Sequence, residues 1–323
     1  MALHPNLDPE LRAAVEAAPL PVTDLSALTL EELQGLRAQT KAFVAAFPPP
    51  PQTGVTVEDR LIPGPEGAPE VRVRIYRPAG GEEGGRPGLY WIHGGGMIMG
   101  VPEMDDALIL DYVERLGLVA VSVDYRLAPE HPHPAPVEDC YAGLVWTAKS
   151  AAELGIDPAR LAVGGASAGG GLAAATVLLA RDRGGPDVLF QLLLCPMLDD
   201  RDDTPSTEQH ADAVVWTRQA NRYGWRALLG DQVGGPDVSP YAAPARAADL
   251  SGLPPAFVDV GEMEVFRDED MDYALRLARA GVSTEFHLYP GAFHGFDMMV
   301  PDAALSRRAR EARVAALKRA YGV

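Results

Sequence analysis

Residues Gly165–Gly169 read Gly-Ala-Ser-Ala-Gly and lie between two segments with opposite structural preferences. Residues 161–164 before them form a short apolar run typical of a buried strand, whereas residues 172–180 after them are mostly Leu, Ala and Val and favour a helix. A strand that turns into a helix within so few residues crowds the backbone on both sides of the central serine, where Cβ atoms would clash. The stretch therefore predicts a sharp turn that lifts the Ser167 hydroxyl clear of the backbone and aims a helix N-terminus at the space above it.

The rest of the chain alternates between short apolar runs and segments with helical spacing. Apolar runs predict strands at residues 89–92, 118–123, 161–164, 188–195, 256–260 and 284–289. Helical spacing predicts helices at residues 105–115, 137–154, 172–180, 268–280 and 302–321. Because the strands are almost entirely apolar and alternate with helices, we expect an α/β domain whose mainly parallel sheet is covered by helices on both faces. Residues 55–57 and 71–75 alternate in polarity around a Pro-Gly-rich turn and predict an antiparallel hairpin.

Two segments interrupt this rhythm. Residues 1–47 read as helical, with two helix start signals, and they end at a run of four prolines that acts as a stiff spacer. Residues 197–245 hold an acidic loop followed by one or two helices at 214–216 and 218–229. We interpret this second segment as an insertion over the C-terminal edge of the sheet.

The composition argues against several classes of partner. A formal net charge of −17 repels phosphates and no Lys/Arg-rich block is present, so we expect no nucleic-acid partner. Residues 1–10 lack an apolar core and no run of about 18 apolar residues occurs, so we expect no signal peptide, no stable membrane insertion and a cytoplasmic location. Cys140 and Cys195 are expected to be buried free thiols rather than a disulfide or metal ligands.

A serine hydroxyl is a weak nucleophile at neutral pH, and it needs a base, a group that orients the base, and donors for the oxyanion. These partners are expected in loops that follow strands, because ligands bind beyond the carboxyl ends of a parallel sheet. His294 follows the strand at 284–289 and is itself followed by glycine, so we assign it as the base. The other six histidines lie elsewhere, in the two interrupting segments, the proline-rich loop, the glycine run or mid-strand: His4, His210, His131, His133, His93 and His287.

The carboxylate that orients this base is expected after the strand at 256–260. Glu264 lies in that loop and is our choice. Asp268 starts the next helix, where acids commonly face the positive end of the helix dipole, and it is the alternative. Asp259 lies inside the strand itself. The resulting chain order of serine, acid and histidine is the order found in α/β-hydrolases.

Backbone amides are the expected donors for the oxyanion, because they are rigid and already aimed. The residue after the serine, Ala168, supplies one such amide. Residues 93–96 read His-Gly-Gly-Gly at the end of an apolar strand, and a chain without side chains can bring its amides close to a substrate oxygen. The alternative interpretation of the three glycines is a flexible turn.

Four motifs of the chain occur together, and they are His93–Gly96, Asp124–Glu130, Gly165–Gly170 and His294–Phe296. In combination they resemble the hormone-sensitive-lipase-like carboxylesterases (bacterial family IV), over about residues 55–323. The resemblance implies an α/β-hydrolase fold, with a mostly parallel central sheet, helices on both faces and a helical cap. It implies that residues 1–52 form the N-terminal part of the cap and 197–245 the cap insertion, and that the core consists of 53–196 and 246–323.

The resemblance also implies roles for individual residues. Ser167 would be the nucleophile and His294 the base, and residues 125–130 would hold the loops that frame the site. The oxyanion hole would consist of the amides of Gly95, Gly96 and Ala168.

The chain departs from the family pattern at two positions. Ala166 stands where the residue before the serine is usually Asp, which changes one neighbour of the serine and leaves the turn intact. Glu264 stands where the acid is usually Asp. Because Glu is one methylene longer, its carboxylate must approach the imidazole from a different angle.

Together these parts predict a serine carboxylesterase that needs no metal and no organic cofactor. Ser167 attacks an ester carbonyl while His294 takes its proton, and water activated by the same histidine then hydrolyses the acyl-enzyme. The acidic surface and the cap favour small uncharged esters of short to medium acyl chain. Apolar pocket walls are expected from four residues whose alternative role is ordinary core packing: Met97, Ile98, Trp216 and Phe266.

Other functions use the same parts. The machinery can act on lactones or amides, or transfer an acyl group to an alcohol, and the sequence does not separate these reactions. A non-catalytic ligand receptor on the same fold is a further alternative. Such a receptor is expected to have lost part of the serine, acid and histidine set, whereas all three residues are present here. A homo-oligomer is compatible with each of these functions.

Overall fold

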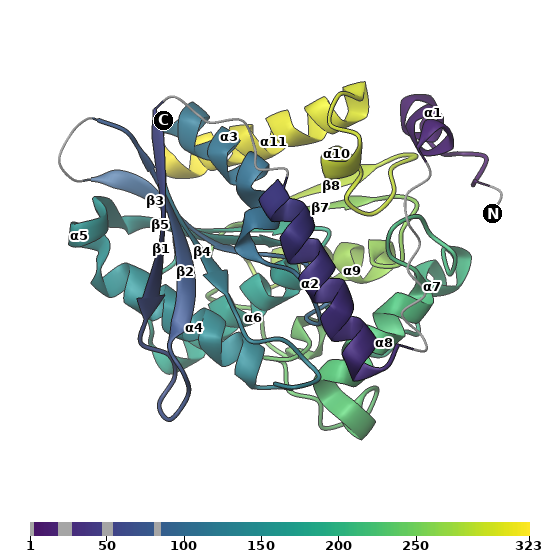
Figure 1. Cartoon of the computed structure of the whole chain (residues 1–323), viewed down its shortest axis with the longest axis horizontal. Coiled ribbons are helices and arrows are strands. Elements are labelled where there is room, and N and C mark those ends of the chain that lie inside the picture. The colour runs from purple at the N-terminus through teal and green to yellow at the C-terminus, as the bar shows by residue number, and fades with distance from the viewer. Residues whose placement is uncertain (1–2, 19–27, 47–53, 81–84) are drawn as a thin grey trace.

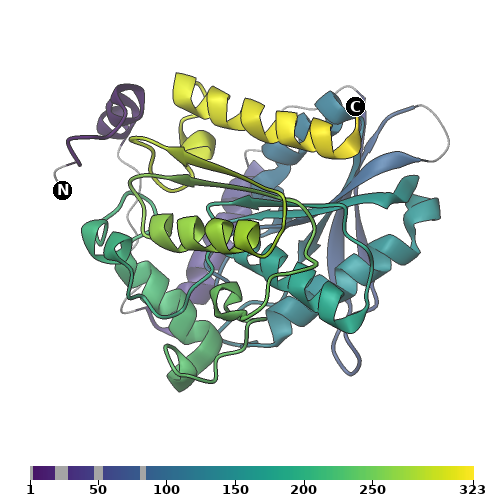
Figure 2. The same cartoon turned by 180° about the vertical axis from the view of Figure 1, so that it is seen from behind.

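A twisted β-sheet forms the centre of the molecule, as Figures 1 and 2 show from opposite sides. The computed structural model describes residues 3–18, 28–46, 54–80 and 85–323. Within these residues the strands are β1 (Val55–Ile62), β2 (Val71–Pro78), β3 (Arg86–Ile92), β4 (Val119–Asp124), β5 (Ile156–Ala166), β6 (Phe190–Leu194), β7 (Ala256–Gly261) and β8 (Thr284–Tyr289). They lie side by side in the order β1-β2-β4-β3-β5-β6-β7-β8.

The pairing of the strands is mostly parallel. β2 runs antiparallel to β1 and to β4, and every other neighbouring pair is parallel. This confirms both the predicted N-terminal hairpin and the predicted parallel sheet. All parallel strands therefore end on the same edge, and the loops that follow them gather there.

Helices cover both faces of this sheet (Figures 1 and 2). The α-helices of the described residues are α1 (Pro9–Ala17), α2 (Leu30–Ala46), α3 (Asp106–Leu116), α4 (Ala135–Lys149), α5 (Ala151–Leu154), α6 (Ala168–Arg183), α7 (Pro205–Gln209), α8 (Arg218–Leu229), α9 (Arg267–Arg279), α10 (Phe296–Met299) and α11 (Ala304–Tyr321). Successive residues of β3 pack in opposite directions. Trp91 joins the core formed with α3 and α11, whereas Tyr90 joins the core formed with α4, α6 and α9. Burial on both faces explains why the strands are apolar throughout.

The structure corrects the predicted helices in four places. The predicted helix over 214–216 is wrong, because Val215 has a φ of 73°, and α8 begins only after Thr217, whose side chain caps it. The predicted helix over 137–154 is divided at Ser150 into α4 and α5. The short helices α7 and α10 had no counterpart among the predicted elements.

The two segments that interrupt the α/β rhythm contact loops that follow β3 and β4. The guanidinium of Arg37, in α2, donates to the carbonyl oxygen of Ile98 at 2.6 Å and forms an ion pair with Glu130 at 2.7 Å. The Tyr223 hydroxyl, in α8, donates to the carbonyl oxygen of Leu28 at 3.4 Å, which links the two segments. Their assignment to one cap stays a prediction.

The structure tests two expectations, namely that no segment spans a membrane and that both cysteines are buried free thiols. No helix in the described part of the chain combines the length and the apolarity needed to cross a membrane. Both cysteines are free thiols, as predicted, but only Cys140 is fully buried. Cys195 is partly exposed because it lies just past the end of β6, at the edge of the sheet.

Asp105 is a buried carboxyl on the face covered by α3. It is 3% exposed, and its Oδ2 accepts a hydrogen bond from the Trp91 indole N–H at 2.7 Å. Burial raises the pKa of Asp105 to about 7, opposed by the Trp91 hydrogen bond and reinforced by the charges of Asp106 and Asp297. The folded protein therefore keeps this proton at pH values where an ordinary aspartate has lost it.

Asp105→Asn is expected to stabilise the protein more at high pH than at low pH. The unfolded chain releases this proton around its ordinary pKa of 3.8, whereas the folded protein holds it up to about 7. The free energy of unfolding therefore falls as the pH rises through this window, on the order of 1.4 kcal/mol per pH unit. Asparagine has no proton to lose and still accepts from Trp91, so the loss disappears in the variant.

Thermal unfolding at about pH 5 and about pH 8 measures this difference, since these values lie within and above the window. Asp187→Asn, at an exposed position, is the control and is expected to give the same small difference from wild type at both pH values. An equal stability difference for Asp105→Asn at both pH values would contradict the assignment.

Candidate active site

The serine turn, residues Gly165–Gly169, joins β5 to α6 and depends on its two glycines. A Cβ at Gly165 would lie 2.2 Å from the carbonyl oxygen of Gly169, and one at Gly169 would lie 2.0 Å from the carbonyl oxygen of Ile92. Because these neighbours are backbone atoms of the sheet and the helix, no larger residue fits at either position. Ser167 has a φ of 57° and a ψ of −125°, a strained conformation for a residue with a side chain. The strand, turn and helix predicted from the sequence are confirmed.

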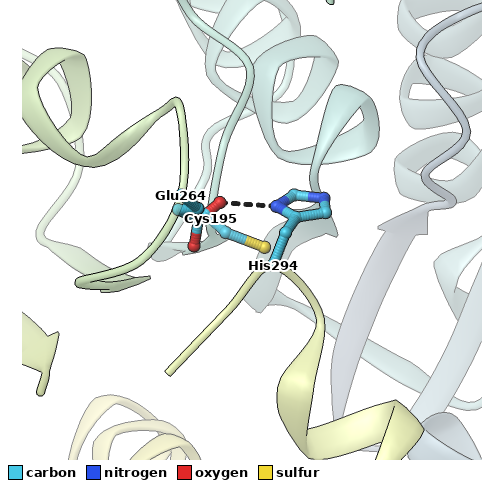
Figure 3. A group of neighbouring side chains, drawn as sticks. All are labelled: Cys195, Glu264 and His294. Atoms are coloured by element: carbon cyan, nitrogen blue, oxygen red, sulfur yellow. Dashed lines mark hydrogen bonds and ion pairs between the residues drawn. The ribbon is translucent and has the colours of Figure 1, made fainter. Parts of the chain in front are cut away.

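Hydrogen bonds link Ser167, His294 and Glu264 in series. The Nε2 of His294 lies 2.9 Å from the Ser167 Oγ, and its Nδ1 lies 2.5 Å from the Glu264 Oε2; Figure 3 shows the second of these contacts. Glu264 is 1% exposed and His294 is 6% exposed, so water competes little for either contact. With Glu264 ionised, the Nδ1–H donates to the carboxylate, and Nε2 is left to accept the serine hydroxyl.

The structure brings Glu264, and not Asp268, to the histidine. The second oxygen of Glu264, Oε1, accepts the N–H of Gly261 at 2.8 Å, and this bond turns the longer side chain so that Oε2 faces the imidazole. The carboxylate of Asp268 instead accepts the N–H of Ser206 at 2.8 Å and the Nε–H of Arg267 at 2.7 Å. Asp268 thus fastens α7 to the start of α9.

The N-terminal segment holds the loop that carries His294. The N–H of Asp8 donates to the carbonyl oxygen of Gly291 at 3.0 Å, and a Cβ at Gly291 would lie 2.6 Å from that same nitrogen. Leu11 of α1 packs in one apolar cluster with Phe293. From the other side, the ring of Phe266 meets the His294 ring edge-on, with centroids 5.3 Å apart. The imidazole is therefore constrained from two directions.

A buried ion-pair group, which the sequence interpretation missed, lies beyond this loop. Arg313 of α11 is 3% exposed and donates to Asp259 within β7 at 2.6 Å and to Asp297 of α10 at 2.5 Å. Since α10 begins two residues after His294, the group ties the histidine loop to the sheet. The sequence does contain one indication of this ion-pair group. Arg313 occupies a position of α11 where the helical spacing predicts a buried apolar side chain.

The glycine-rich loop lies against the serine turn. A Cβ at Gly94 would lie 3.3 Å from the Ser167 Cβ, and the loop turns tightly through Gly95 and Gly96, which have φ values of 116° and 62°. The three glycines therefore form an ordered turn, packed against Ser167. Ala168, the first residue of α6, is buried beside the same space.

His93 anchors the start of this loop. It is fully buried, and its ring stacks on Tyr125 at a centroid distance of 4.4 Å. Burial lowers the pKa of His93, so the ring is neutral and its Nδ1–H donates to the carbonyl oxygen of Gly94 at 2.8 Å. The Tyr125 hydroxyl donates to the His93 carbonyl oxygen at 3.0 Å. The 125–130 motif thus supports the glycine-rich loop through Tyr125.

The four expected pocket residues are all buried in one core cluster, and two of them touch the site. Phe266 contacts the His294 ring, and Trp216 packs so closely on Gly96 that a Cβ there would lie 2.3 Å from the indole. Met97 and Ile98 follow the glycine-rich loop directly and are fully buried. Their contact with a substrate stays a prediction.

Comparison with known proteins gives consistent matches. A family model described as alpha/beta hydrolase fold matches residues 89–298. The carboxylesterase NlhH of Mycobacterium tuberculosis is 38% identical over 326 residues, covering 98% of this chain and 97% of that protein. A solved bacterial heroin esterase is 44% identical with a TM-score of 0.91, covering 98% of each chain. The esterase LipW from Mycobacterium marinum is 37% identical with a TM-score of 0.81, covering 98% of this chain and 96% of that one.

Proposed function

Because the chain belongs to the hormone-sensitive-lipase-like carboxylesterases of the α/β-hydrolase fold, we propose that it hydrolyses small uncharged esters through an acyl-enzyme on Ser167. Membership of this family makes it a carboxylic ester hydrolase. The observation that carries the proposed mechanism is the series of hydrogen bonds from Ser167 to His294 to Glu264. These contacts supply a nucleophile, a base and an orienting acid in the required order.

In the proposed reaction, the Ser167 Oγ attacks the ester carbonyl carbon while its proton passes to the Nε2 of His294. Glu264 accepts the Nδ1–H throughout and stabilises the imidazolium that forms. His294 then gives the proton to the leaving alcohol, and it later activates the water that releases the acid. The proposed oxyanion donors are the amides of Gly95, Gly96 and Ala168.

The proposal of a short to medium, uncharged acyl chain rests on charge and on packing. A net charge of −17 disfavours anionic esters. Trp216 and Phe266 place bulky apolar rings against the glycine-rich loop and the histidine, which favours an apolar group of limited size there. A serine, histidine and glutamate in contact, in a family of esterases, also argues against the non-catalytic receptor.

A series of nitrophenyl esters of increasing acyl length tests this function. We expect kcat/KM to be higher for the acetyl and butyryl esters than for the palmitoyl ester, because the rings of Trp216 and Phe266 limit the space for a long acyl chain. A serine-directed phosphonate is expected to label one residue per chain and to stop turnover, with the label on the peptide that contains Ser167. Turnover that survives stoichiometric labelling, or a label on another residue, would contradict the mechanism.

A further inference from the structure

Cys195 lies beside the pair formed by Glu264 and His294, and its sulfur points toward His294 (Figure 3). The thiol sulfur, a Glu264 carboxylate oxygen and a His294 ring nitrogen all lie within 4.8 Å of one another. In the part of the chain that the structure describes, this is the one group of three or more such side chains that could hold a metal ion. The mechanism proposed above uses the carboxylate and the imidazole, and it gives the thiol no role.

A backbone hydrogen bond to the neighbouring strand holds Cys195 in place. Cys195 has a φ of 37°, and its N–H donates to the carbonyl oxygen of Asp259, in β7, at 2.7 Å. The three side chains therefore come from segments that directly follow β6, β7 and β8, three adjacent strands of the sheet. The cluster therefore lies at one edge of the sheet, where the order of the strands brings the three loops together.

The donor set selects a particular kind of cation. One thiolate sulfur, one imidazole nitrogen and one carboxylate oxygen suit borderline and soft ions such as Zn²⁺ and Cd²⁺, whereas Mg²⁺ and Ca²⁺ prefer oxygen ligands alone. We propose that Cys195, Glu264 and His294 form a latent site for such a thiophilic divalent cation, and that occupation of the site stops ester hydrolysis. The effect on hydrolysis rests on the function proposed above, whereas the binding of the cation does not.

Binding exchanges one proton for the cation. Bonds form from the cation to the Cys195 sulfur, the His294 Nδ1 and a Glu264 oxygen. The thiol proton passes to solvent, and the Nδ1 proton is replaced by one on Nε2, so that the imidazole stays neutral. No electrons are transferred. The present Nδ1–Oε2 distance of 2.5 Å must widen to about 3.3 Å, the separation of two ligands on a tetrahedral zinc ion. The imidazole then shifts relative to Ser167, and its Nε2 carries a proton, so it can no longer take the proton of the serine hydroxyl.

A nearby buried carboxyl adds to the electrostatic preference for a cation. Asp270, in α9, is completely buried, and neither of its carboxyl oxygens has a hydrogen-bond partner among the described residues. Burial raises the pKa of Asp270 well above its ordinary range, and the charges of Glu269 and Glu264 add to this, so the carboxyl keeps its proton in the metal-free protein. A cation bound beside Cys195 and Glu264 favours the ionised form of Asp270, so binding of the cation and ionisation of this carboxyl support each other.

Titration of cadmium chloride into the purified chain tests the proposal. In the wild-type protein, the ultraviolet absorption of a cadmium–thiolate bond is expected to saturate at one ion per chain. In parallel, kcat for a nitrophenyl ester falls while KM is unchanged, and EDTA restores it. Cys195→Ser is expected to lose the absorption and to need at least about tenfold more cadmium for half inhibition, relative to its own metal-free rate. Cys140→Ser is the matched control, and it keeps both responses because Cys140 is buried in α4.

Equal inhibition of the wild-type protein and Cys195→Ser would overturn the proposal, because the cation would then act at other carboxylates. If the absorption saturates and kcat does not fall, the cation binds at the site but does not stop hydrolysis, and that part of the proposal is wrong. Cys195→Ala answers the same question if the serine variant fails to fold. The absorption titration does not depend on ester hydrolysis. If the absorption saturates in the wild-type protein and is lost in the Cys195 variants, the cation site is supported even if the protein hydrolyses no ester.

Discussion

Replacing Ser167 with alanine is expected to lower kcat for a nitrophenyl ester by about 10⁴- to 10⁶-fold, as in other serine hydrolases that lose the nucleophile. The His294 Nε2 then has no hydroxyl to activate, and only the residual effect of the oxyanion donors remains. The fold should persist, because the turn depends on the glycines at 165 and 169 and on backbone contacts rather than on the serine Oγ. Steady-state kinetics measure the fall in kcat, and thermal unfolding tests whether the fold persists.

Ser283→Ala is a suitable control, because Ser283 is exposed just before β8, and His294 follows the opposite end of that strand. This variant should retain wild-type kcat and unfolding temperature. Turnover in Ser167→Ala close to that of the control would mean that Ser167 is not the nucleophile. A large fall in the unfolding temperature would mean instead that the lost activity reports a damaged turn.

The second large effect concerns the acid. Glu264→Gln is expected to lower kcat by about 10³- to 10⁴-fold, because a neutral amide neither holds the productive imidazole tautomer nor stabilises the imidazolium. Asp268→Asn should lower kcat far less, by under about tenfold, because its carboxylate bonds Ser206 and Arg267 rather than the histidine. The side-chain volume hardly changes in either substitution, so the comparison isolates charge.

Unfolding temperatures separate the two roles further. Asp268→Asn is expected to weaken the attachment of α7 to α9 and to lower the unfolding temperature, whereas its pH–rate profile keeps the shape of the wild-type profile. Glu264→Gln is expected to change that profile, since the group that stabilises protonated His294 is gone. If the order of the two effects on kcat is reversed, Asp268 is the acid and the geometry at Glu264 has another purpose.

The serine turn and the strand alternation could be predicted because their causes are local. A turn from a strand to a helix within a few residues needs glycine wherever the backbone approaches itself, and a Cβ added at Gly165 or Gly169 would lie 2.2 or 2.0 Å from a backbone oxygen. Apolar runs separated by helices imply a parallel sheet, and that sheet carries the loops after its strands to one edge. The general place of His294 and of its acid followed from this rule alone.

Other features depended on distances that no local pattern contains. The sequence predicts a helix at residues 214–216. The structure excludes Val215 from α8 because its φ is 73°, in the left-handed region. Arg313 and its two carboxylates meet across α11, β7 and α10. The contact of Asp8 with Gly291 joins residues from opposite ends of the chain. These contacts depend on how helices and strands pack together. The residues next to either contacting residue in the sequence do not reveal that packing.

By itself, the sequence determined the sheet, the serine turn and the short list of residues from which a base and an acid could come. Only the tertiary structure showed that Glu264, and not Asp268, contacts His294, because Glu264 lies in the loop after β7 whereas Asp268 lies in the first turn of α9. It also placed the Cys195 thiol beside the histidine, since strand order in the sheet makes β6, β7 and β8 neighbours. Side chains that are far apart in the chain meet there because the backbone hydrogen bonds of adjacent strands fix the separation of the loops that follow them.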